Sequence, residues 1–91
     1  MNDQQVIIES LALDLKRVAV GLQRGSTRMA ERFKVEALRR EDELEKLVSD
    51  RYLHVIITGS RKSLLANSAN TPEDALMYST LLQNFTQKHF P

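Results

Sequence analysis

The sequence predicts an all-α fold, a helical hairpin followed by a shorter third helix, completed by oligomerisation. Apolar residues recur at spacings of three and four along most of the chain, which is the period of a helix. Only five of the 91 residues are aromatic, fewer than is typical of a β-sandwich or barrel. A chain of this length forms one domain at most, so we treat residues 1–91 as a single helical domain.

The first predicted helix covers residues 4–23 and carries two apolar lines on opposite sides. The main line follows the spacing of a coiled-coil seam and consists of Ile8, Leu11, Leu15, Val18 and Leu22. The second line contains Val6, Leu13 and Val20, each seven residues apart. A helix with two apolar sides usually packs against other elements on both sides. We expect the second helix to pack on one side, and either the third helix or a second subunit to pack on the other.

A long second helix is predicted over residues 28–66, with a possible break at Gly59. It follows a turn at residues 25–27, where glycine suits the end of one helix and serine or threonine the start of the next. Residues 52–58 are rich in β-branched side chains, which favour a strand. No second strand-like run could pair with that segment, so we expect it to be helical.

The third helix is expected over residues 72–88, and its start has the clearest local signal. Thr71 resembles an N-cap, Pro72 suits the first helical position, and Glu73 and Asp74 suit the first turn, where acidic groups face the helix dipole.

Charge is unevenly distributed, although the net charge is only +1. Residues 16–40 hold eight cationic and two acidic residues, whereas residues 41–50 hold five acidic residues and one lysine. A basic segment of this kind can bind phosphates. The alternative function is therefore that of a small nucleic-acid-binding regulator, with contacts from Arg24, Arg28, Arg32 and Arg39. Acidic residues lie close beside these arginines, so nucleic acid is the less favoured partner.

Two arginines, Arg40 and Arg51, fall within the apolar arc of the second predicted helix. A buried guanidinium without a partner is costly, so each must reach water or meet a carboxylate. Asp14 lies at the rim of the main apolar line of the first helix. We therefore expect a possible buried ion pair between Arg40 and Asp14.

No catalytic, metal or cofactor site is expected. The chain contains no cysteine and two histidines, and His54 lies between apolar neighbours, which is unfavourable for a reactive phosphoryl acceptor. The acidic run over residues 41–45 is a single cluster, whereas a magnesium site needs oxygen ligands from more than one element. We interpret that run as a solvated face of ion pairs.

These observations together predict a non-enzymatic protein–protein interaction module, acting as an adaptor, regulator or assembly cofactor through apolar helix faces. The first partner expected is a second copy of the chain, and another protein is possible. The interface residues expected are Val6, Leu13 and Val20. Neither a signal peptide nor a membrane span of roughly 20 apolar residues is evident, so a cytoplasmic location is expected.

Overall fold

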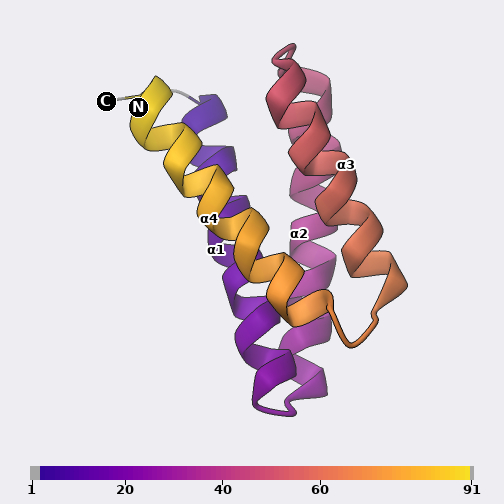
Figure 1. Cartoon of the computed structure of the whole chain (residues 1–91). Coiled ribbons are helices and arrows are strands. Elements are labelled where there is room, and N and C mark those ends of the chain that lie inside the picture. Colours follow the sequence, from indigo (N-terminus) through magenta and orange to yellow (C-terminus); the bar gives the residue numbers. More distant parts are fainter. Residues whose placement is uncertain (1–2, 91) are drawn as a thin grey trace.

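The computed structural model describes residues 3–90, and within them all regular structure is helical. Four helices follow one another along the chain (Figure 1): α1 (Asp3–Gln23), α2 (Thr27–Leu47), α3 (Arg51–Ala66) and α4 (Thr71–His89). The prediction of an all-α fold is thus confirmed, including a helical conformation for residues 52–58. The predicted three-helix arrangement is wrong, because residues 28–66 form two helices.

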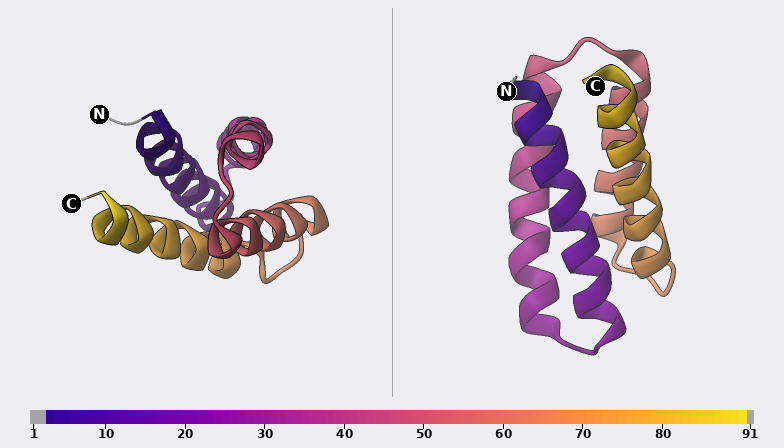
Figure 2. Two further views of the ribbon diagram at one scale, coloured as in Figure 1. Left: turned by 90° about the horizontal axis from the view of Figure 1, so that it is seen from above. Right: turned by 90° about the vertical axis from the view of Figure 1, so that its left-hand side faces the viewer.

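Helix α1 lies at the centre of the arrangement and packs against both α2 and α4. Helix α3 packs along α4 and makes few contacts with α2, as the view from above shows (Figure 2). The molecule is elongated, with principal extents of 35 × 20 × 18 Å. The two hairpins, α1–α2 and α3–α4, are therefore joined mainly through α1 and α4.

The break in the predicted long helix occurs at residues 48–50 and not at Gly59. Val48 adopts an extended conformation, and the Asp50 side chain then accepts a hydrogen bond from the Leu53 amide at 3.1 Å, which caps the start of α3. Gly59 lies inside α3, where a Cβ atom would collide with the Tyr78 ring. This glycine therefore allows close packing of α4 on α3 instead of interrupting the helix.

The start of α4 also differs from the expectation. The N-cap is Asn70, without a side-chain hydrogen bond to the helix, and Thr71 is already helical. The Thr71 hydroxyl donates to the Ser63 carbonyl at 3.1 Å and accepts from the Ser68 amide at 2.8 Å. It therefore stabilises the α3–α4 turn, a role that depends on a residue eight positions away. Pro72 does occupy the first turn.

The core forms around the main apolar line of α1, as predicted: Ile8, Leu11, Leu15 and Val18 are buried and Leu22 is partly buried. Helices α1 and α2 approach closely at Gly21, where a Cβ atom would lie 2.8 Å from the Ala30 backbone nitrogen. The turn between them matches the expected pattern. Gly25 has a φ of +73° and the Ser26 hydroxyl caps α2.

Candidate interaction surfaces and a buried acid

The outer side of α1 is an apolar line that no other part of residues 3–90 covers completely. Val6 and Leu13 are 42% and 43% exposed, and Val20 is half-buried. Helix α4 meets α1 on a different side, where the Ser79 hydroxyl donates to the Ala12 carbonyl at 2.6 Å. The third predicted helix thus packs on α1 but leaves Leu13 exposed. We call Val6, Leu13 and Val20 the outer α1 line.

Charge reverses along α1 beside this line. The N-terminal half carries Asp3 and Glu9, the C-terminal half carries Lys16 and Arg17, and Arg24 directly follows the helix. None of these five side chains forms an ion pair within the part of the chain that the structure describes. The exposed side of α1 is therefore apolar along its middle, acidic at one end and basic at the other.

Arg40 and Asp14 form an ion pair between α2 and α1, with Nε and Oδ2 2.7 Å apart. The Asp14 side chain is 6% exposed and the Arg40 side chain 27% exposed. The carboxylate is therefore buried, while the guanidinium retains some contact with water. Arg51, the other arginine of the predicted apolar arc, is exposed because a new helix begins there.

The tip of the α1–α2 hairpin is basic and extends beyond the α3–α4 turn (Figure 2). Arg24, Arg28 and Arg32 have no ion-pair partner among residues 3–90. The guanidinium carbons of Arg17 and Arg32 lie 5.0 and 5.5 Å from the centre of the Phe33 ring. Two arginines from different helices thus converge on one ring, and neither forms an ion pair within the described chain.

Arg39, the fourth arginine proposed to contact nucleic acid, is already engaged. Its guanidinium lies 2.7 Å from Glu36 on the preceding turn of α2. This hydrogen-bonded pair holds the pKa of Glu36 below its ordinary value and raises that of Arg39. The structure thus places Arg17, rather than Arg39, beside Arg32. Sequence reasoning missed Arg17 because it lies on the other helix of the hairpin.

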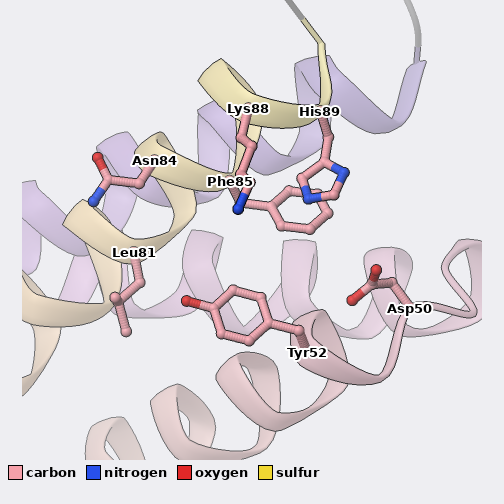
Figure 3. Close-up of a pocket in the computed structure, with 7 residues that line it drawn as sticks. All are labelled: Asp50, Tyr52, Leu81, Asn84, Phe85, Lys88 and His89. Atoms are coloured by element: carbon pink, nitrogen blue, oxygen red, sulfur yellow. The ribbon is translucent and has the colours of Figure 1, made fainter.

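A shallow hollow of about 390 Å³ lies between the start of α3 and the end of α4 (Figure 3). Tyr52, Leu81 and Phe85 form its apolar part, and the His89 ring stacks on Phe85 with ring centres 4.1 Å apart. The polar residues Asp50, Asn84 and Lys88 also line it. Both an acidic and a basic group are present, so charge does not indicate the class of ligand.

Glu41 is the main departure from the expected solvated acidic face. It is completely buried at the junction of α2 and α3, where the Ser60 hydroxyl donates to Oε2. Its other oxygen, Oε1, is buried and accepts no hydrogen bond from any described residue. Burial raises the pKa of Glu41 from 4.5 to about 7, although the Ser60 hydrogen bond and the charge of Arg61 oppose the shift.

The sequence contained a signal for this burial. Glu41 follows Ala37 by four positions and precedes Leu44 by three, so all three residues share one face of α2, and both neighbours are buried. The interpretation as a solvated face holds for Asp42 and Glu45, which lie 2.9 and 3.0 Å from Arg61 of α3. It was wrong for Glu41.

The remaining candidate, His54, has a local structural role. One ring nitrogen lies 2.8 Å from the Val48 carbonyl, which connects α3 to the end of α2. Within residues 3–90 no three histidine, aspartate or glutamate side chains converge as a metal site would require. No helix in that range is both long enough and apolar enough to span a membrane.

No protein-family model matches this chain, and no curated protein or solved structure is significantly similar to it. Functional inference therefore rests on the surfaces and side chains described above.

Proposed function

We propose that this protein is a protein-interaction module that first binds a second copy of itself through the outer α1 line. The observation that carries the proposal is the exposure of Val6 and Leu13 in one row on a long helix whose charge reverses along its length. An apolar row with charged ends is the pattern by which helices select both a partner and an orientation.

A two-fold axis at Leu13 satisfies this pattern. If the two copies of α1 run antiparallel, Leu13 meets its own symmetry mate and Val6 of one protomer faces Val20 of its partner. The same arrangement brings Glu9 near the partner's Arg17. One self-complementary patch then covers the apolar row and pairs opposite charges, which is the usual geometry of a homodimer.

The energy available suits a reversible dimer. Completing the burial of a half-exposed valine or leucine contributes about 1 kcal/mol, roughly half the value for a fully exposed side chain. Six such side chains in the dimer give several kcal/mol, from which the cost of association is subtracted. A micromolar dissociation constant requires about 8 kcal/mol, so we expect a weaker dimer that dissociates at high micromolar to millimolar concentration, as suits an adaptor, regulator or assembly cofactor. We also propose that the protein acts in the cytoplasm.

Sedimentation equilibrium over a concentration series from micromolar to millimolar tests self-association. The wild-type chain is expected to dimerise and Leu13→Glu to remain monomeric, because the variant places two carboxylates at the two-fold axis. Val35→Glu is the matched control, since Val35 is 62% exposed and lies on α2. A wild-type chain that stays monomeric at all concentrations would refute the proposal. Equal weakening of the dimer by Leu13→Glu and Val35→Glu would refute it as well.

A charge exchange tests the antiparallel orientation. Glu9→Arg and Arg17→Glu should each weaken the dimer several-fold, and the double variant should recover most of the loss, because opposite charges again face each other. Additive losses in the double variant would exclude the antiparallel pairing.

Nucleic-acid binding is the second candidate, and one observation favours it: Arg17, Arg24, Arg28 and Arg32 lie at the hairpin tip without carboxylate partners. Phosphate contacts release counterions, so binding of a labelled oligonucleotide should weaken steeply as salt rises. Arg28→Gln should reduce both affinity and salt dependence. The paired Arg39 provides the control, and an equal effect of Arg39→Gln would contradict this assignment.

A further inference from the structure

The contact between α2 and α3 is both sparse and polar. In its interior the Ser60 hydroxyl donates to Glu41, and at its edge Arg61 contacts Asp42 and Glu45. We call this contact the α2–α3 seam. It differs from the α1–α2 contact, which is extensive and where Gly21 allows close approach to Ala30.

An ionised Glu41 is poorly accommodated in this seam. Oε2 has a single hydroxyl donor and Oε1 has none among the described residues. Removing a carboxylate from water without full hydrogen bonding is costly. A neutral carboxyl group at the same position loses far less hydration and can itself donate a hydrogen bond.

No nearby charge compensates the carboxylate fully. On α2, Asp42 and Glu45 repel it, and on α3 the attractive Arg61 is already bonded to those two carboxylates. On α1, Asp14 is paired with Arg40. On α4, the Asp74 carboxylate accepts a hydrogen bond from Ser63 of α3.

We propose that Glu41 is a neutral acid in the packed molecule and that loss of its proton opens the α2–α3 seam while the α1–α2 hairpin remains packed. The short connection at residues 48–50 allows such a movement, because it is the only non-helical link between the two helices. Opening hydrates the carboxylate without disturbing the contact at Gly21. The protonation state of Glu41 thus controls whether α3 packs against α2.

The direction of the effect follows from the two protonation states. An exposed glutamate loses its proton near pH 4.5, whereas burial holds the pKa of packed Glu41 at about 7. Opening therefore releases a proton between these values, and the packed state is most stable below them. Across this interval the opening equilibrium shifts toward the open state by up to roughly 300-fold, a factor of ten per pH unit. Above about pH 7 the effect levels off.

Hydrogen exchange resolved by residue, corrected for the intrinsic pH dependence of exchange, tests the proposal. In the wild-type chain, protection of α3 amides should fall between pH 5 and pH 8, because a short helix that has lost its packing against α2 unfolds locally more often, while α1 amides keep theirs. Glu41→Gln should retain α3 protection at pH 8, because the amide is neutral and nearly isosteric. Glu43→Gln, an exposed position on the same helix that forms no ion pair with α3 in the described chain, should behave as wild type. Equal loss of protection in all helices, or none in α3, would overturn the proposal.

A titration of the unmodified chain covers the case in which Glu41→Gln fails to fold. Carbon-detected NMR should show the Glu41 carboxyl titrating near pH 7, together with shifts of α3 resonances. Titration of this carboxyl below about pH 5 would refute the neutral acid. Titration near pH 7 without any change in α3 would refute the opening.

Discussion

Among residues 3–90 the side-chain carboxyl groups of Asp14 and Glu41 are buried, and their surroundings are opposite. Asp14 is held between α1 and α2 by a guanidinium that still reaches water. Glu41 is held between α2 and α3 by a single hydroxyl, with its other oxygen without a partner in the described chain. The comparison shows that burial alone does not fix the role of an acid. The partner decides whether its charge stabilises the packed state or opposes it.

The difference follows from position on α2. Arg40 lies at the edge of the α1–α2 contact, where a long side chain can bury its stem and keep its charged end partly hydrated. Glu41, one residue further, points into the interior between Ala37 and Leu44. Two consecutive positions on α2 therefore have different surroundings: Arg40 forms an ion pair at the edge of the contact, and Glu41 is an acid in the core.

The largest effect on stability should come from removing the partner of Asp14. Arg40→Met leaves a buried carboxylate without a cation and should lower the free energy of unfolding by about 3 kcal/mol, as expected when one member of a buried pair is lost. Asp14→Asn should cost only about 1 kcal/mol, because the guanidinium can turn to water and still donate to the amide oxygen. Denaturant unfolding at pH 7 measures both.

The asymmetry between these two variants is the informative result. If Asp14→Asn cost as much as Arg40→Met, the guanidinium could not reach water, and the pair would have to be regarded as fully buried.

A smaller, pH-dependent effect is expected for Ser60→Ala. The hydroxyl donates to Glu41 in the packed seam, so the loss should be about 1 kcal/mol at pH 5, where Glu41 is neutral and the seam is packed. At pH 8 the loss should be smaller, because the proposed opening of the seam already separates Ser60 from the ionised Glu41. Denaturant unfolding at the two pH values tests this, and equal losses would contradict opening of the seam at pH 8.

Local sequence patterns predicted the helices well and the tertiary partners unevenly. The apolar line of α1 and the turn at Gly25 depend on neighbouring residues, and both were predicted correctly. The pairing of Arg40 with Asp14 could be suggested because an arginine in an apolar arc requires a carboxylate. Thr71 could not be assigned to the α3–α4 turn, because its partner Ser63 lies in another helix.

The break at residues 48–50 and the burial of Glu41 were missed for related reasons. A helix over residues 28–66 preserved the apolar period, so the N-cap signal of Asp50 was not used. The acidic run was interpreted from composition, although the spacing of Glu41 from Ala37 and Leu44 placed it on the apolar face. The interpretation relied on the acidic character of Glu41, whereas its position on the helix determined that it is buried.

The smallest effect should come from the charges at the edge of the α2–α3 seam. Asp42→Asn removes one of two carboxylates from Arg61, but the Asp42 side chain is 68% exposed and Arg61 keeps its contact with Glu45. Exposed ion pairs contribute little, so the change in stability should stay within about 0.5 kcal/mol.

Asp42 also repels an ionised Glu41 and so raises its pKa. The variant should therefore titrate at slightly lower pH, with any loss smaller at pH 8 than at pH 5. A loss above about 1 kcal/mol at either pH would show that the edge of the seam, and not the buried acid, holds α3 on α2.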